Sequence, residues 1–371
     1  MVKIMTVIGA RPQFVKAAVL SRLIRSEPWR GRFSELLVHT GQHYDENMSA
    51  VFFREMCIPE TDVNLGIGGG GHGEMTGCML QALENLILEK KPDIVLVYGD
   101  TNSTLAGALA ASKLLIPVAH VEAGLRSFCT RMPEEQHRRL TDRLSTWLLC
   151  PTETAVRNLS REGLEDPGPG TAPTADSPRV ANVGDVMYDA SLFYRSIAAE
   201  RPAEERALKR LGIDRPFHLL TLHRAENTDD PGRLASILSA LGMSGIGSIV
   251  FPLHPRTRKM LIAFGLEVPR NVREIEPVGF LDMLELEQEC DGIITDSGGV
   301  QKEAYFFGKP CVTLRDQTEW TETVESGWNH VVGADPRAIL AALAAPIPNG
   351  SRPELYGSGD AGERILAELD R

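Results

Sequence analysis

The sequence predicts an α/β protein with two Rossmann-like doubly wound domains that face each other across a cleft. Buried apolar runs of strand length alternate with helical patterns along most of the chain, and polar or glycine-containing loops follow several of these runs. The alternation restarts after an irregular stretch rich in proline and glycine at residues 165–178. We therefore expect a first domain at residues 1–170, a second at 171–350, and a C-terminal segment, 351–371, whose helix crosses back to the first domain.

Composition limits the classes of ligand. The 371 residues are 43% hydrophobic and 24% charged, with a net charge of -11, which is typical of a soluble globular protein and argues against nucleic-acid or anionic-membrane surfaces. The six cysteines form no C-x-x-C pair, so we expect reduced thiols and no metal. The first apolar run is too short for a signal sequence or a membrane span. We expect a cytoplasmic protein with a small ligand.

The first domain opens with a buried strand at residues 4–8 and a glycine turn into a helix. Arg11 and Lys16 place two cations near that helix start, and His43 follows a second strand at residues 36–40. The glycine-rich residues 66–73 contain G-x-G-x-x-G, but no clear strand precedes them and no acidic residue follows at the dinucleotide spacing. We interpret them as a loop that precedes a helix at residues 75–90.

Three acidic residues come at the same edge of this predicted sheet. Asp100 ends a buried strand that starts at residue 93, Glu122 ends the strand that starts at residue 116, and Glu134 opens the helix that follows. Like charges crowded there would raise pKa values into a range useful for proton transfer. Glu134 could instead only complement the helix dipole.

The second domain is predicted to begin with a strand at residues 179–184 and a helix from about Val186. Strands at residues 217–222 and 248–253 lead to His223 and His254, and a strand at 271–276 precedes a helix at 283–289. Polar loops thus follow the strand ends in this half as well.

Residues 292–304 carry the most informative pattern. A short strand is followed by Ser297, a good N-cap, and by Gly298 and Gly299, which let a ligand approach bare N–H groups at a helix start. Glu303 lies about one and a half turns further along, too far for a capping box, and could accept hydrogen bonds from a diol such as ribose. The helix is expected to stop at Gly308, before a strand at residues 309–314. This pattern predicts an anion site.

Seven segments together resemble the non-hydrolysing UDP-N-acetylglucosamine 2-epimerases, and they span nearly the whole chain in order. They are residues 9–16, 40–43, 99–104, 120–126, 132–135, 222–226 and 295–303. The resemblance implies a GT-B-like fold, a homodimer, a UDP-sugar substrate and no redox cofactor. It implies interconversion of UDP-GlcNAc and UDP-ManNAc for surface polysaccharide precursors, by elimination of UDP to a 2-acetamidoglucal and re-addition.

The resemblance also implies site residues. The expected catalytic residues are Asp100, Glu122, Glu134 and His223. The substrate-binding residues that it implies are Arg11, Lys16, Ser297, Gly298, Gly299 and Glu303, and we add His254 because it follows the strand at residues 248–253. Which carboxylate is the base and which is the acid stays open.

Two departures concern the sugar. Trp320 stands where UDP-GlcNAc members of the family have arginine, and Val278 stands where they have glutamine. Together with His43 they are candidate specificity residues, and the surrounding sequence looks closer to the branch that epimerises UDP-2,3-diacetamido-2,3-dideoxyglucuronate. That substrate would need a cation for its carboxylate, and Arg126, Arg131, Arg224 and Arg256 are candidates. A GT-B glycosyltransferase, a hydrolysing epimerase and a nucleotide-sugar sensor are the alternative functions.

Overall fold

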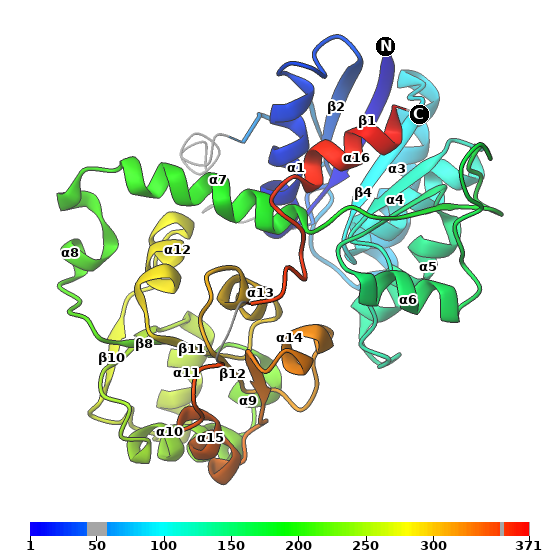
Figure 1. Cartoon of the computed structure of the whole chain (residues 1–371). Helices are drawn as coiled ribbons and strands as arrows, with labels where there is room; N and C mark the ends of the chain where they lie inside the picture. The colour runs from blue at the N-terminus through cyan, green and yellow to red at the C-terminus, as the bar shows by residue number, and fades with distance from the viewer. Residues whose placement is uncertain (43–57, 349–351, 371) are drawn as a thin grey trace. The chain divides into compact units, whose positions relative to one another are not determined.

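The computed structural model describes residues 1–42, 58–348 and 352–370 of the chain (Figure 1). The chain divides into two compact units, the first formed by Met1–Ala190 with Glu354–Arg371 and the second by Ser191–Pro353. Both are α/β units with entirely parallel sheets, so the predicted fold class is confirmed. In the described part of the chain, no helix combines the length and the apolar character that a membrane crossing requires.

The first unit contains a seven-stranded sheet in the order β3-β2-β1-β4-β5-β6-β7. Its strands are β1 (Val2–Ile8), β2 (Phe33–His39), β3 (Val63–Asn64), β4 (Ile94–Tyr98), β5 (Val118–Val121), β6 (Trp147–Cys150) and β7 (Arg179–Asn182). Its helices are α1 (Arg11–Ile24), α3 (His72–Lys90), α4 (Asn102–Lys113), α5 (Pro133–Leu144), α6 (Glu153–Arg161) and α16 (Ala361–Leu369). The apolar residues of α3 and α4 pack with one face of β1 and β4, as the cluster around Val7, Val97 and Leu83 shows.

The predicted start of the second domain, at residue 171, lies earlier in the chain than the start of the second unit, at Ser191. Strand β7 pairs with β6 and therefore belongs to the first sheet, and residues 165–178 connect α6 to β7 inside the first unit. The division falls instead within α7 (Val186–Glu200). The helix after the glycine-rich stretch was predicted to begin at residue 75, but α3 already begins at His72.

The second unit contains a six-stranded sheet in the order β10-β9-β8-β11-β12-β13. Its strands are β8 (His218–Thr221), β9 (Ile249–Pro252), β10 (Val272–Ile275), β11 (Gly292–Thr295), β12 (Cys311–Thr313) and β13 (Asn329–Val331). Its helices after α7 are α8 (Ala207–Leu211), α9 (Ala225–Thr228), α10 (Pro231–Met243), α11 (Pro255–Phe264), α12 (Phe280–Glu289), α13 (Gly298–Phe306), α14 (Thr321–Glu325) and α15 (Pro336–Leu343).

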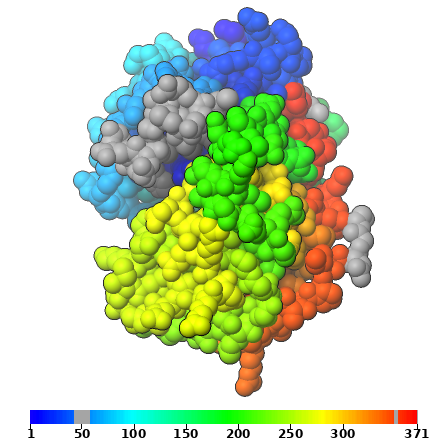
Figure 2. Space-filling model, turned by 90° about the vertical axis from the view of Figure 1, so that its left-hand side faces the viewer, coloured from blue at the N-terminus to red at the C-terminus, as the bar shows by residue number. Residues whose placement is uncertain are grey.

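Apolar clusters cover both faces of this second sheet. One contains side chains of α10, α11 and α15 and includes Ile237, Leu261 and Ile339, and the other contains side chains of α8, α12 and α13. The end of α7 and helix α8 (green) lie against the segment that contains α12 (yellow) in Figure 2. Arg201, which follows α7, donates a hydrogen bond to Asp282 Oδ1 of α12 at 2.8 Å.

The C-terminal helix α16 packs on α1 within the first unit (Figure 1). A Cβ added at Gly362 would lie 2.6 Å from Leu23 Cδ1 and 2.9 Å from Val19 Cγ1, so the two helices approach too closely there for a larger residue. The Asp189 carboxylate accepts hydrogen bonds from the N–H groups of Ala361 (3.2 Å) and Gly362 (2.8 Å) at the start of α16.

The strand order reverses at one point in each sheet. In the first unit it reverses between β1 and β4, and in the second between β8 and β11. Ligands of open parallel sheets bind outside the carboxyl ends of the strands at such switch points. The loops that follow these four strands therefore define where a functional site is expected.

Candidate functional site

At the first switch point, Gln13 holds the loops after β1 and β4 together. Its Oε1 accepts from the N–H groups of Gly9 (2.8 Å) and Ala10 (2.9 Å), and its Nε2 donates to the Tyr98 carbonyl (2.7 Å). A Cβ at Gly9 would lie 2.1 Å from Ser103 Oγ, so the first loop runs directly against the start of α4. The geometry of this edge is consequently fixed by buried hydrogen bonds rather than by exposed loop residues.

Lys16 and Glu122 meet at this edge. Lys16 is only 9% exposed and forms an ion pair with the Glu122 carboxylate. Glu122 directly follows β5 and has a φ of 73°, an uncommon backbone conformation for a residue other than glycine. A Cβ at Gly99 would lie 3.2 Å from Glu122 Oε2, so the glycine leaves room for this carboxylate beside the end of β4. The structure thus brings together two of the predicted site residues.

Asp100 lies next to the same pair. Burial raises the pKa of its carboxyl, the Glu122 carboxylate adds to the increase, and the Arg138 guanidinium, with which Asp100 forms an ion pair, opposes it. Asp100 therefore keeps its proton to higher pH than an ordinary aspartate, and burial contributes more to this increase than the neighbouring carboxylate does. Sequence reasoning missed Arg138, which α5 carries inward, and His137, whose Nδ1 lies 2.9 Å from the Asp100 carbonyl oxygen.

The two adjacent glutamates of α5 differ in surroundings. Glu134 is exposed in the first turn of the helix, one turn before Arg138. Glu135 is fully buried and accepts hydrogen bonds from the N–H (2.8 Å) and hydroxyl (3.0 Å) groups of Ser127. Glu135 therefore fixes the loop before α5, while Glu134 remains accessible to a ligand. Arg11 is likewise exposed, at the first position of α1.

A buried charge network lies behind this edge and occupies Arg126. The Asp142 carboxylate lies 2.7 Å from His120 Nδ1 and 2.8 Å from Arg126 Nη1, and Arg126 also binds both Glu162 oxygens at 2.8 Å. Although burial opposes it, hydrogen bonding by His120 and the charge of Arg126 hold the pKa of Asp142 below its usual range. Arg126 is 2% exposed, so it cannot serve as the cation for a sugar carboxylate.

At the second switch point, Ser297 caps α13 as predicted. Its side chain accepts from the N–H of Val300 at 3.5 Å, and the helix begins at Gly298. Asp296, which sequence reasoning missed, is fully buried and accepts hydrogen bonds from the backbone N–H groups of His223 (3.0 Å) and Arg224 (2.8 Å). This carboxylate ties the loop after β8 to the loop after β11.

Two guanidinium groups lie beside the start of α13. A Cβ added at Gly298 would lie 3.7 Å from Arg224 Nη2, 3.8 Å from Arg315 Nη1 and 2.8 Å from Glu319 Oε1. Arg315 follows β12, is 3% exposed, and forms an ion pair with Glu319 at 2.9 Å. Positive charge thus adds to the N–H groups of the helix start, an arrangement suited to an anion such as a diphosphate. Arg315 is a further site residue that the sequence analysis missed.

His223 and His254 are neighbours, with ring centroids 5.6 Å apart. Burial lowers the pKa of His223, and the positive charges of His254 and Arg224 lower it further, against the raising effect of Asp296. A neutral ring at neutral pH results, and it can donate or accept a hydrogen bond. His254 itself is exposed and caps α11 by accepting from the Arg256 N–H at 3.2 Å. Arg256 pairs with Asp229 at 2.5 Å.

The remaining candidates lie around α13. Glu303 is 7% exposed on this helix. Trp320 is 4% exposed, and Lys302 Nζ lies 4.2 Å from the centroid of its ring, a cation–π contact. Val278 packs against the apolar cluster beneath α12. His43 lies outside the described residues.

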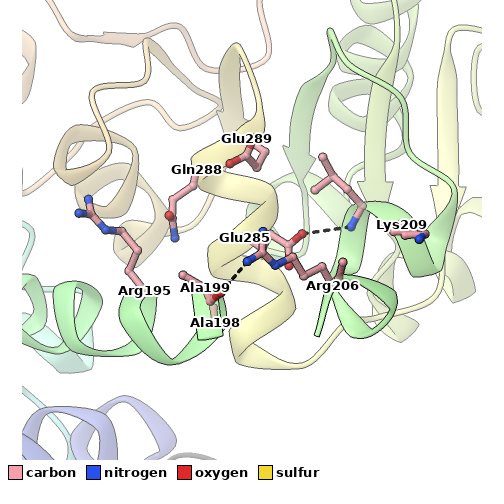
Figure 3. A pocket seen from close by; sticks show the side chains of 10 residues that line it. Arg195, Ala198, Ala199, Arg206, Lys209, Glu285, Gln288 and Glu289 are labelled. Atoms are coloured by element: carbon pink, nitrogen blue, oxygen red, sulfur yellow. Dashed lines mark hydrogen bonds between the residues drawn. The ribbon is translucent and has the colours of Figure 1, made fainter. Parts of the chain in front are cut away.

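A cavity of about 340 Å³ lies elsewhere in the second unit, between α7, α8 and α12 (Figure 3). Its Glu285 accepts from the N–H groups of Ala207 (2.9 Å) and Leu208 (3.3 Å), and Arg206 donates to the Ala199 carbonyl at 2.5 Å. These polar groups are used to join the three helices. Across the described residues, no three His, Cys, Asp or Glu side chains are grouped as they would be around a metal ion.

Comparison with known proteins agrees with this geometry. Residues 28–370 match a family model described as UDP-N-acetylglucosamine 2-epimerase. The chain is 50% identical to the UDP-2,3-diacetamido-2,3-dideoxy-D-glucuronate 2-epimerase of Pseudomonas aeruginosa, with 99% of both chains covered. It is 42% identical to the Methanocaldococcus jannaschii UDP-GlcNAc 2-epimerase whose crystal structure contains UDP-GlcNAc and UDP, with a TM-score of 0.85 over 99% of both chains. The Neisseria meningitidis UDP-GlcNAc 2-epimerase bound to UDP-GlcNAc is 31% identical, with a TM-score of 0.83 over 99% of both chains.

Proposed function

Because the chain belongs to the UDP-N-acetylglucosamine 2-epimerase family, we propose that it is a non-hydrolysing epimerase that inverts C2 of a UDP-linked 2-acetamido sugar. The observation that carries this proposal is the group formed by Asp100, Glu122, Lys16 and Arg138 at the β1/β4 switch point. Binding of a nucleotide alone does not need two carboxylates that are each paired with a cation, one of them with a raised pKa.

The second unit supplies the groups for UDP. The start of α13, with Ser297, Gly298 and Gly299, offers N–H donors, and Arg224 and Arg315 add positive charge beside it. We assign the diphosphate to this site and the ribose to Glu303. The neutral His223 ring, held by the Asp296 loop, can donate a hydrogen bond to an oxygen on which negative charge develops.

The reaction would proceed by elimination and re-addition. A carboxylate takes the C2 proton, the C1–O bond breaks with its electron pair leaving on UDP, and a double bond forms between C1 and C2. Re-addition of UDP to C1, with protonation of C2 on the opposite face, gives the epimer without consuming water. Asp100, Glu122 and Glu134 are the groups to which we assign the proton transfers, and the raised pKa of Asp100 moves it in the direction that a proton donor requires.

The experiment that tests the reaction is incubation with UDP-GlcNAc in deuterated water, followed by NMR at C1 and C2. We expect UDP-ManNAc to form with deuterium at C2 and with UDP retained on the sugar. Free ManNAc and UDP would indicate a hydrolysing enzyme. Unchanged substrate, with transfer of the sugar only when an acceptor is added, would indicate a glycosyltransferase.

UDP-GlcNAc is the first candidate substrate, and UDP-2,3-diacetamido-2,3-dideoxyglucuronate is the second. Two observations favour the second: the 50% identity to an epimerase of that name, and the buried contact of Trp320 with Lys302, which places an aromatic ring and a cation together beside α13. Arg126 pairs with Asp142 and Arg256 with Asp229, so Arg131 and Arg224 are the candidates that we keep for meeting the sugar carboxylate.

The ratio of kcat/KM for the two substrates, measured with one enzyme preparation, decides between them. A tenfold preference corresponds to about 1.4 kcal/mol of discrimination in the transition state. A preference of that size for UDP-GlcNAc would remove the uronate. The homodimer implied by the family resemblance stays a prediction.

A further inference from the structure

A second buried carboxyl group lies beside Glu303. Glu287, on α12, is 1% exposed, and both of its carboxyl oxygens are buried. In the described part of the chain, no group donates a hydrogen bond to either oxygen, and the side chain that acts most strongly on this carboxyl group is that of Glu303. Two carboxyl groups can form a hydrogen bond only when one of them carries a proton.

The proton belongs on Glu287. Two carboxylates facing each other away from water repel strongly, so one of them is kept neutral. Glu287 is the deeper of the two, since Glu303 is 7% exposed on α13. Burial, together with the Glu303 carboxyl, raises the pKa of Glu287 well above its usual range, which agrees with a neutral acid at neutral pH. The result is a single negative charge, on the carboxyl group that lies nearer to the surface.

We propose that Glu287 is a positioning residue, whose protonated carboxyl donates a hydrogen bond to Glu303 and fixes the orientation in which Glu303 accepts a ribose hydroxyl of the nucleotide. This inference rests on the proposed function, which assigns the ribose to Glu303. Glu287 is buried more deeply than Glu303, so we assign the nucleotide contact to Glu303 alone. Its role is to keep a carboxylate with several rotatable bonds in one conformation before the nucleotide arrives, so that less freedom is lost on binding.

The expected effect of a Glu287 variant on UDP affinity depends on whether the new side chain can still donate a hydrogen bond to Glu303. Replacement of Glu287 by glutamine keeps the size of the side chain and an N–H donor for Glu303. Replacement by methionine keeps the length, removes the donor, and leaves an apolar side chain that suits a buried position. We therefore expect Glu287→Gln to bind UDP as the parent does and Glu287→Met to bind it about tenfold more weakly. Glu289→Met is a matched control, because Glu289 lies on the same helix and pairs with Arg215 at the surface.

The test is calorimetric titration of the full-length protein and these variants with UDP and with 2′,3′-dideoxy-UDP, which lacks both ribose hydroxyls. Glu287→Met should lose affinity for UDP only, and all variants should bind the dideoxy nucleotide equally. Equal UDP affinity of the Gln and Met variants would overturn the positioning role. A loss in Glu287→Met that persists with the dideoxy nucleotide would assign Glu287 to packing instead.

Glu303→Ala separates this inference from the function on which it rests. If Glu303→Ala leaves UDP affinity unchanged, the ribose does not bind there, and the proposed nucleotide site fails together with the positioning role. If Glu303→Ala weakens UDP binding while Glu287→Met does not, only the positioning role fails. Thermal unfolding of each variant shows whether the second unit stays folded during the comparison.

Discussion

The adjacent glycines at the start of α13 differ sharply in the room around them, and this difference predicts opposite effects of alanine. A Cβ at Gly298 would lie 2.8 Å from Glu319 Oε1, whereas a Cβ at Gly299 would meet only Ser297 Oγ, at 4.0 Å. Neither glycine has a positive φ, so backbone strain does not contribute. Gly298→Ala should therefore destabilise the second unit, and Gly299→Ala should not.

The cost at Gly298 comes from the Glu319–Arg315 ion pair. Contacts below 3.0 Å must be relieved, so Glu319 has to move away from the new methyl group, out of a 2.9 Å contact between side chains that are 11% and 4% exposed. Loss of such a hydrogen bond between charged groups costs about 1.5 to 3 kcal/mol. Alanine in a helix recovers up to about 1 kcal/mol relative to glycine. With the full recovery, the net loss is about 0.5 to 2 kcal/mol for Gly298→Ala, against a gain of up to about 1 kcal/mol for Gly299→Ala.

Urea denaturation measures this difference. Trp320 and Trp328 lie in the second unit, and Trp320 directly follows Glu319, so tryptophan fluorescence reports on this region. With a slope of about 2 kcal/mol per molar urea, the midpoint of Gly298→Ala should fall by about 0.25 to 1 M. A Gly298→Ala variant as stable as Gly299→Ala would refute the close packing of Glu319 against the start of the helix.

Two further predictions concern single carboxyl groups. Asp100→Asn and Glu122→Gln should each lower kcat by about a hundredfold or more while leaving UDP affinity near that of the parent, because both belong to the first unit and the proposed diphosphate site to the second. Near-normal turnover in either variant would remove that residue from the mechanism. Asp189 lies on α7 and accepts hydrogen bonds from the N–H groups at the start of α16. Its pKa is raised from 3.8 to about 6, chiefly by burial. Its folded-state pKa lies above the unfolded value, so its contribution to stability is complete below about pH 4 and is lost as pH rises through 6. Between about pH 5 and pH 7.5 the parent should lose about 1 kcal/mol that Asp189→Asn does not lose, in urea titrations at both pH values; parallel pH profiles would contradict this.

Much of the fold could be predicted because its signals are local. The buried runs that form β1 and β4 are long enough to stand out, and Ser297 followed by two glycines marks the start of a helix. Strand β6 and helix α6 were missed, since four residues from Trp147 give too short a pattern. The strand at 179–184 was assigned to the second domain because the proline- and glycine-rich residues 165–178 precede it, although these residues connect α6 to β7 within the first unit.

The site was predicted less completely, because partners from different elements carry no local signal. Arg138 meets Asp100 only when α5 packs beside the end of β4, and Arg315 reaches the start of α13 from the end of a neighbouring strand. Asp296 could have been suspected, as a carboxylate that ends a buried strand one residue before a helix cap. The role of Glu135 depends on which side of α5 faces inward. Because Glu134 and Glu135 are adjacent and identical in type, the sequence alone does not distinguish them.

The assignment of α16 to the first unit has a consequence for biosynthesis. The second unit is one uninterrupted segment, Ser191–Pro353, inserted between two parts of the first. During translation the ribosome therefore releases all of the second unit before it releases the helix that completes the first. Until then the surface of α1 near Val19 and Leu23, which Gly362 later covers, has no partner from α16. The nascent first unit must wait for the whole inserted segment to be made, whereas the second can mature as soon as its own residues have left the exit tunnel.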